Sequence, residues 1–331
     1  MTTTDETTLT TGTPAGSMIE STPMQMDAGR ELLEKVRSKT ARVTVMGLGY
    51  VGLPLVQAVH QAGFHVIGYD VDESKIGKLR KGEGYLKHLG PELARSLAAS
   101  DRFRATSDTA DIASADIVVL CVPTPLGEHR EPDLSYVLNS TEITAQTLRS
   151  GQLVVLESTT YPGTTRDEMV PVLERGAAQR GLNLKAGRDF FVAYSPERED
   201  PGRAGFTTSS IPKLVGGIDH DSGRLASAFY QSFIERVHDV SSAEVAEGAK
   251  LLENIYRAVN IALVNELKVV LDRMGIDIWE VVDAASTKPF GYRASALGRS
   301  MARARGLPLI EVQHHHAHIA ACMMEHELPD D

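Results

Sequence analysis

From Arg42 onward the sequence alternates short apolar, β-branched runs with longer amphipathic stretches, and this alternation constrains the fold more than any other feature. Such runs suit the buried strands of a parallel sheet, and the stretches between them are long enough for right-handed helical crossovers. The predicted strands cover residues 42–46, 65–69, 116–122, 153–157 and 190–194, and the predicted helices cover residues 52–62, 74–81, 134–148 and 165–180. The pattern predicts a doubly wound α/β fold with a parallel sheet.

The motif GLGYVG places Gly47, Gly49 and Gly52 directly after the first predicted strand and at the start of a helix. In a dinucleotide-binding turn, the first glycine permits the tight turn, the second lets the backbone approach a pyrophosphate, and the third allows close helix–strand packing. Asp70 ends the next strand, where a carboxylate accepts hydrogen bonds from a ribose diol and repels a 2′-phosphate. The combination predicts a Rossmann-like NAD site that disfavours NADP. A glycine turn beside a surface aspartate is the weaker alternative, because strand, turn and helix occur in the expected order.

Three further motifs follow predicted strands, at the sheet edge where ligands bind in this type of fold. Thr124 in CVPTP either faces the cofactor or is an ordinary hydroxyl in a proline-bracketed turn. Thr159 in ESTTYPGTT and Glu197 in SPERED either orient and share protons with a water or serve in helix caps and turns. Composition alone does not separate these alternatives.

Residues from Ser242 onward run without proline until Gly275 and predict one long helix. Its apolar positions cover more than one face, which predicts burial against several partners. Lys250 and Asn254 share one face because they are four residues apart. This pair either stabilises a developing alkoxide or belongs to a solvated stripe.

Composition limits the classes of partner. The chain has 331 residues, 42% of them hydrophobic and 24% charged, which is typical of a soluble protein of about two domains. A net charge of -10 argues against nucleic acid as a partner, although it is compatible with a local basic pocket for one small anionic ligand. The two cysteines, Cys121 and Cys322, make no disulfide framework, and no apolar run is long enough to span a bilayer. We therefore expect a cytoplasmic protein without a membrane segment, and Cys121 is interpreted as a core residue.

The sequence predicts four regions. Residues 1–28 are rich in Thr, Ser, Gly and Pro and predict a disordered leader. An NAD-binding domain is expected over residues 29–241, and a central helical and dimerisation region over residues 242–292. Residues 293–331 form a separate C-terminal segment, described below.

Six motifs occur in order from about Ala41 to Tyr292: GLGYVGLPL, CVPTPL, ESTTYPGTT, SPEREDPG, KLLENIYRAVNIALVNE and STKPFGY. Together they resemble the UDP-glucose/GDP-mannose dehydrogenase family, and most of all its UDP-N-acetylhexosamine 6-dehydrogenase branch. By that resemblance, the cofactor-binding positions are Gly47, Gly49, Gly52, Asp70, Lys75 and Thr124. The resemblance assigns Thr159, Glu197, Lys250 and Asn254 to holding water, thioester and alkoxide during two hydride transfers from a UDP-sugar to NAD. Separately, the long helix with apolar residues on several faces leads us to expect a homodimer formed through it.

After STKPFGY the sequence departs from this family, which continues with a nucleophilic cysteine, a catalytic aspartate and a UDP-binding domain. Here the chain reads RASALGRSMARARGLPLIEVQHHHAHIAACMMEHELPDD, and without a thiolate there is no route to the thioester of the second oxidation. Residues 295–328 resemble a short piece of the hydrogenase-maturation carbamoyltransferases. That likeness makes His314 and His318 the metal-ligand positions of a weak Zn²⁺ or Fe²⁺ site.

The leading interpretation is therefore an NAD-dependent nucleotide-sugar 6-dehydrogenase that is incomplete as a single chain and fused to a carbamoyltransferase fragment. One alternative is a non-catalytic NAD-binding and oligomerisation module, whose long helix pairs with another subunit. A second alternative is a metal-binding regulator that uses the histidine tail.

Overall fold

The computed structural model describes residues 27–86, 89–127, 132–197 and 212–285. Among them, the residues up to Ala249 form one compact unit and the residues from Lys250 form a second. Most of the predicted leader and the whole segment 293–331 lie outside the described residues. Asp27 and Ala28, which were expected in the leader, instead begin helix α1 (Asp27–Arg37).

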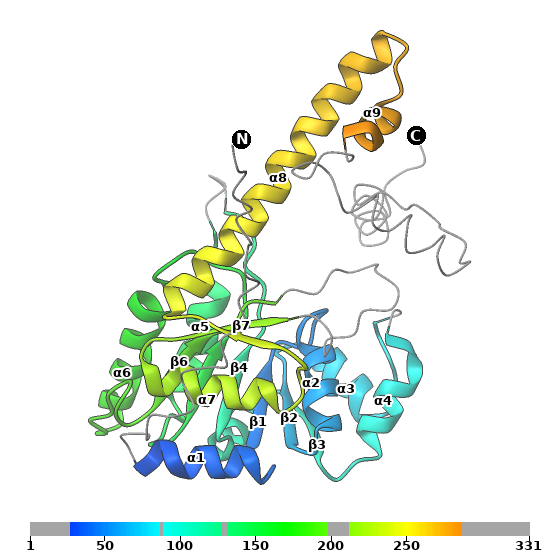
Figure 1. Ribbon diagram of the computed structural model, residues 1–331. Helices are drawn as coiled ribbons and strands as arrows, with labels where there is room; N and C mark the ends of the chain where they lie inside the picture. Colours follow the sequence, from blue (N-terminus) through cyan, green and yellow to red (C-terminus); the bar gives the residue numbers. More distant parts are fainter. Residues whose placement is uncertain (1–26, 87–88, 128–131, 198–211, 286–331) are drawn as a thin grey trace, which may run out of the picture. The chain divides into compact units, whose positions relative to one another are not determined.

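An eight-stranded sheet of described residues forms the centre of the first unit, in the order β3-β2-β1-β4-β5-β6-β7-β8 (Figure 1). The first six strands pair in parallel, β7 is antiparallel to β6, and β8 is parallel to β7. The strands are β1 (Arg42–Met46), β2 (His65–Tyr69), β3 (Phe103–Thr106), β4 (Ile117–Leu120), β5 (Leu153–Leu156), β6 (Phe191–Tyr194), β7 (Lys213–Gly217) and β8 (Val237–Asp239). The order of β1 to β6 is that of doubly wound dinucleotide-binding domains, so the predicted fold class is confirmed.

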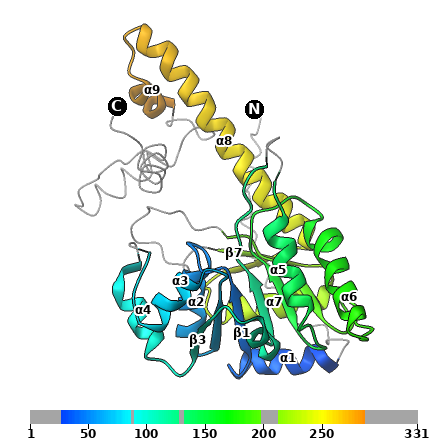
Figure 2. The ribbon, with the colours of Figure 1, turned by 180° about the vertical axis from the view of Figure 1, so that it is seen from behind.

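Helices cover both faces of the sheet, as Figures 1 and 2 show from opposite sides. One hydrophobic core lies between the sheet and α1, α2, α3, α4 and α7, and a second lies between the sheet and α5 and α6. The helices not yet given bounds are α2 (Gly52–Gln61), α3 (Glu73–Arg80), α4 (Gly90–Ala98), α5 (Ser135–Ala145), α6 (Val170–Gln179), α7 (His220–Gln231), α8 (Ala243–Arg273) and α9 (Ile278–Ala285). A short 3-10 helix, η2 (Thr109–Ser114), precedes β4, and a π-helical turn, η3 (Thr164–Met169), leads into α6.

The long helix is confirmed as α8, which ends just before Gly275 with its left-handed backbone (φ 71°). The described part of the chain leaves several of its apolar side chains exposed, so the expected burial against several partners stays a prediction. Leu252, Ile255 and Val259 are 67%, 51% and 60% exposed. Exposed apolar side chains on more than one face of a helix are typical of a surface that packs against further structure.

No helix among the described residues is both long enough and apolar enough to cross a membrane.

Candidate functional site

Gly47 and Gly52 build the turn after β1 for steric reasons. Gly47 has a left-handed backbone (φ 92°), and a Cβ atom at this position would lie 2.6 Å from the carbonyl oxygen of Cys121. A Cβ atom at Gly52 would lie 1.8 Å from the carbonyl oxygen of Gly47. Only glycine fits either place, so the tight turn and the close helix–strand contact expected from the sequence are both present.

Gly49 differs from the other two glycines because a Cβ atom there would meet no atom within 4 Å. The chain therefore does not need glycine at this position for its own packing. The open side of the loop lies at the start of α2, where backbone N–H groups and the helix dipole favour an anion. Open space at this place fits a pyrophosphate that approaches the backbone closely.

Asp70 joins the glycine loop to the end of β2. Its buried carboxylate accepts hydrogen bonds from the backbone N–H of Leu48 (2.8 Å, Oδ2) and of Asp72 (2.9 Å, Oδ1). Lys75 Nζ lies 3.1 Å from Asp70 Oδ2. The structure thus brings together Asp70, Lys75 and the glycine loop, three features that the sequence placed in one cofactor site.

The segments after β4 and β5 form the next part of the same sheet edge. Ser158 Oγ donates a hydrogen bond to the carbonyl oxygen of Val122 (2.6 Å), which ties the two segments together. Thr124 is half-buried on the first segment, and Thr159 is exposed on the second, between the buried Ser158 and Thr160. Thr159 is therefore accessible, whereas the hydroxyl groups of its two neighbours make hydrogen bonds within the protein.

Glu197, which follows β6, belongs to a buried charged cluster that sequence reasoning missed. Lys213 Nζ, from β7, lies 2.9 Å from Glu157 Oε2 and 3.5 Å from Glu197 Oε2. Tyr230 of α7 donates a hydrogen bond to Glu157 Oε1 (2.5 Å). Lys213, Glu157 and Tyr230 are all buried. The ammonium group of Lys213 therefore approaches Glu197 from the protein interior and is shielded from bulk water.

The ionisation of this cluster follows from burial and charge. Burial alone would lower the pKa of Lys213, but the carboxylates of Glu157 and Glu197 raise it above its ordinary value. Burial raises the pKa of Glu157, with Lys213 acting in the opposite direction. Cys121 is also buried, and desolvation together with Glu157 and Glu197 raises the pKa of its thiol well above the ordinary value. The interpretation of Cys121 as a core residue is confirmed.

Glu247 of α8 fixes the loop that follows Thr159. Its buried carboxylate accepts hydrogen bonds from the backbone N–H groups of Gly163 (2.7 Å) and Thr165 (2.9 Å) and from Thr165 Oγ1 (2.7 Å). These donors lie at the start of η3, where a helix end leaves N–H groups without partners. The motif ESTTYPGTT is therefore held in place by a residue more than eighty positions away in the sequence.

Comparison with known proteins assigns this arrangement to a family. A sequence model described as the UDP-glucose/GDP-mannose dehydrogenase family, NAD binding domain, matches residues 41–234, and the model of the family's central domain matches residues 244–301. The chain belongs to the UDP-glucose/GDP-mannose dehydrogenase family. A third model, the HypF Kae1-like domain, matches residues 284–325, in agreement with the carbamoyltransferase likeness of the tail.

Several known proteins are similar to the chain. The UDP-N-acetyl-D-glucosamine 6-dehydrogenase of Pseudomonas aeruginosa is 38% identical over 251 residues, which are 76% of this chain and 57% of that protein. Protein CapL of Staphylococcus aureus is 40% identical over 74% of this chain and 56% of its own length. The UDP-D-ManNAc dehydrogenase structure from Pyrococcus horikoshii superposes with a TM-score of 0.68 at 34% identity and covers 75% of this chain and 58% of that one. The chain thus spans little more than half the length of these relatives.

The other two positions that the family resemblance assigned to the chemistry lie outside the first unit. Lys250 and Asn254 are half-buried on α8 and belong to the second compact unit. Their approach to Thr159 and Glu197 stays a prediction.

His314 and His318 lie outside the described residues, so the metal site stays a prediction as well. Within the described residues, no three side chains of His, Cys, Asp or Glu are grouped to hold a metal ion.

Proposed function

We propose that this chain is the NAD-binding part of a cytoplasmic nucleotide-sugar 6-dehydrogenase that acts on UDP-N-acetylglucosamine or a related UDP-hexose. The observation that carries the proposal is the open position at Gly49, above a loop that Asp70 ties to β2. Gly47, Gly49 and Gly52 would hold the pyrophosphate, and Asp70 with Lys75 would hold the adenosine ribose. When bound, NAD supplies the ring that accepts a hydride from the sugar.

The residues at the sheet edge suit the steps that surround such a transfer. Glu197 accepts a proton from a water or shares one with it, and the ammonium of Lys213 lies 3.5 Å from its Oε2 atom. The exposed hydroxyl of Thr159 orients that water. For Lys250 and Asn254, on the second unit, the family resemblance supports a role in stabilising the alkoxide that forms when the sugar hydroxyl loses its proton.

Among these 331 residues, the second oxidation lacks its nucleophile. Cys121 is buried with a raised pKa, and Cys322 lies in the region matched by the HypF Kae1-like domain. We therefore propose that the chain by itself oxidises an alcohol slowly, at most to the aldehyde, and that the thioester route to a uronic acid is impaired.

NAD binding tests the core of the proposal. In fluorescence titrations the chain should bind NAD with a clear preference over NADP, because the Asp70 carboxylate repels a 2′-phosphate. Asp70→Ala should weaken NAD binding about tenfold or more and reduce the preference. Asp101→Ala, at an exposed position on the same unit, is the matched control and should change neither affinity. Equal affinities for NAD and NADP in the unmodified chain would contradict the proposal.

A non-catalytic NAD-binding and oligomerisation module is the second candidate function, and the exposed apolar side chains of α8 favour it. They also support a homodimer formed through this helix. Light scattering after gel filtration should give the mass of a dimer, and Ile255→Glu with Val259→Glu should give a monomer. Glu266→Gln, on the same helix, should leave the dimer intact. NADH formation with a UDP-sugar separates the candidates, because a non-catalytic module produces none.

A further inference from the structure

A cavity of about 260 Å³ lies between α1, α7 and β8, within the first unit. Its wall includes Lys39, which precedes β1, whereas the glycine loop follows β1, so the strand separates this cavity from the NAD site. Helix α1, Lys39 and Asp239 lie outside the residues 41–234 and 244–301 that the two family models match. The proposed dehydrogenase function therefore leaves the cavity without a role.

Three cations line the cavity: Arg37, Lys39 and Arg224. Asp239 is the only acidic side chain in its wall, although the chain as a whole carries a net charge of -10. A local excess of positive charge on an acidic protein attracts a small anion, and two guanidinium groups suit a phosphate, which they bind through paired hydrogen bonds.

Lys39 has a strained backbone conformation, and its amino group packs against the wall of the cavity. It is the only non-glycine residue with a positive φ (61°) among the described residues, and it follows the last turn of α1, where glycine is usual. Its Nζ atom donates to the carbonyl oxygen of Ser232 (3.3 Å) and lies 4.6 Å from the ring centroid of Phe64. The amino group is thus fixed in the wall rather than free in solvent.

The rest of the wall suits an organic group. Leu33, Val36 and Ala228 contribute apolar surface, and Ser227 and Gln231 contribute hydroxyl and amide groups, with Gln231 Nε2 donating to Ser227 Oγ (3.1 Å). The volume lies slightly below the range of about 300–1,000 Å³ usual for ligand pockets, so a dinucleotide is too large.

We propose that this cavity binds a nucleoside monophosphate. The phosphate pairs with Arg37, Lys39 and Arg224. The base covers the apolar surface of Leu33, Val36 and Ala228. Asp239 lies in the same wall and supplies the carboxylate that accepts hydrogen bonds from the ribose hydroxyls.

Calorimetry on the full chain tests the proposal, with UMP as the probe and saturating NAD present to occupy the glycine-loop site. UMP should bind, and uridine and inorganic phosphate should each bind about tenfold more weakly or worse, because each lacks one half of the recognised group. Arg37→Gln with Arg224→Gln should weaken UMP about tenfold or more while the affinity for NAD stays unchanged. The matched control is Arg95→Gln, on α4, which should leave UMP binding unchanged.

Several outcomes would overturn the proposal. Absence of UMP binding to the unmodified chain would do so, as would UMP binding that the double arginine variant leaves intact. Inorganic phosphate binding as tightly as UMP would reduce the cavity to a general anion site, and uridine binding as tightly would remove the role of the cations. Arg37 is exposed, so Arg37→Gln alone keeps the test readable if the double variant does not fold.

Discussion

At the scale of single residues, Gly49 and Gly52 belong to one motif but have separable roles. We expect Gly49→Ala to fold like the unmodified chain, because its Cβ would meet no atom within 4 Å, and to lose about tenfold or more in NAD affinity, because the methyl group occupies the side that a pyrophosphate approaches. Gly52→Ala should instead lower the free energy of unfolding by about 2–4 kcal/mol, since its Cβ would lie 1.8 Å from the Gly47 oxygen.

Urea denaturation and NAD titration of both variants measure these effects. The assignment of roles fails if Gly49→Ala binds NAD normally, or if Gly52→Ala is as stable as the unmodified chain.

Lys213 makes the second residue-level prediction. Lys213→Met leaves the Glu157 carboxyl buried without a counter-charge, and we expect it to lower the free energy of unfolding by about 3 kcal/mol. Adding Glu157→Gln removes the stranded charge and keeps an acceptor for the Tyr230 hydroxyl, so the double variant should recover most of the loss. Equal stability of the single and double variants in urea would show that the pair carries no buried charge.

The glycine loop could be predicted from the sequence, whereas the buried cluster around Lys213 could not. Gly47, Gly49 and Asp70 could be predicted because their spacing follows a local strand–turn–helix pattern. Lys213 and Tyr230 could not, because each is a single residue far from Glu157 in the sequence. The order of β5, β6 and β7 brings Lys213 to Glu157, and the packing of α7 on the sheet brings Tyr230 there. The closeness of Asp70 to the Leu48 N–H was also beyond the motif itself.

At the scale of elements, the sequence predicted the apolar interior strands and missed the others. Strands β1 and β2 have the predicted bounds, and β4, β5 and β6 are shorter than predicted. The missed strand β3 is short and partly exposed at the sheet edge, and β7 reads KLVGG, with a charge and two glycines that obscure its pattern. The glycine at position 216 is required because a Cβ atom there would lie 2.1 Å from the Ser242 oxygen.

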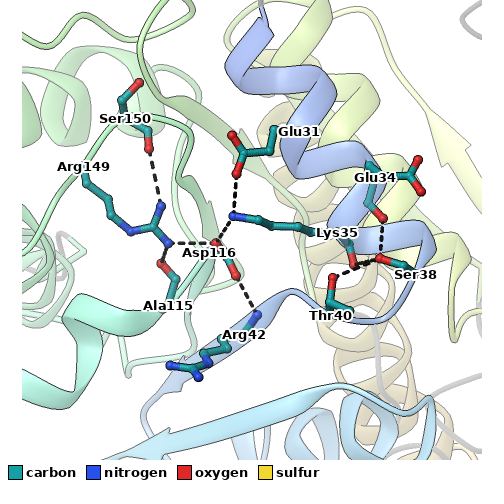
Figure 3. A network of polar contacts seen from close by, with 10 residues as sticks. All are labelled: Glu31, Glu34, Lys35, Ser38, Thr40, Arg42, Ala115, Asp116, Arg149 and Ser150. Atoms are coloured by element: carbon teal, nitrogen blue, oxygen red, sulfur yellow. Dashed lines mark hydrogen bonds and ion pairs between the residues drawn. The ribbon is translucent and has the colours of Figure 1, made fainter.

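Helix α1 was missed because it follows a low-complexity stretch, yet it is joined to the sheet by polar contacts. Asp116, just before β4, accepts hydrogen bonds from the Arg42 N–H (2.9 Å), Lys35 Nζ (3.2 Å) and Arg149 Nη2 (2.8 Å), as Figure 3 shows. Burial would raise the pKa of Asp116, but these three donors outweigh it and lower the pKa below its ordinary value. The carboxylate therefore joins α1 to the starts of β1 and β4.

This network predicts a pH dependence of stability. Because the pKa of Asp116 is lower in the folded than in the unfolded chain, its contribution is complete above the unfolded pKa of about 4 and is lost as pH falls through the folded value. Asp116→Asn should cost about 1–3 kcal/mol at pH 7 and progressively less on acidification. Thermal denaturation between pH 7 and pH 3 measures both effects, with Asp101→Asn as the control. A loss in Asp116→Asn that is the same at pH 3 as at pH 7 would rule out this role of the ionised carboxylate.

At the scale of the whole molecule, the chain matches two sequence models of the dehydrogenase family and a third model of a different family. The dehydrogenase models cover residues 41–234 and 244–301, and the HypF Kae1-like match covers residues 284–325. Under the proposed function, the first unit would supply the residues that bind the cofactor. The thioester step would depend on a thiolate and on remote contacts to the UDP-sugar. We therefore expect this chain to fold stably and to bind NAD even if it does not turn over a UDP-sugar.

The final prediction follows from that separation: the chain alone should not convert UDP-N-acetylglucosamine to a uronic acid at a rate comparable with its full-length relatives. Cys121 is buried and its pKa is raised, so it is a poor nucleophile. A trace of NADH from slow oxidation to the aldehyde agrees with this expectation, since the roles proposed for Thr159 and Lys250 in that step need no thiolate. The measurement is NADH formed per sugar, with the product identified by mass spectrometry, in the unmodified chain and in Cys121→Ser with Cys322→Ser. Fast uronic acid formation with two NADH per sugar, unchanged in the cysteine-free variant, would refute the requirement for a thiolate and with it the proposed impairment.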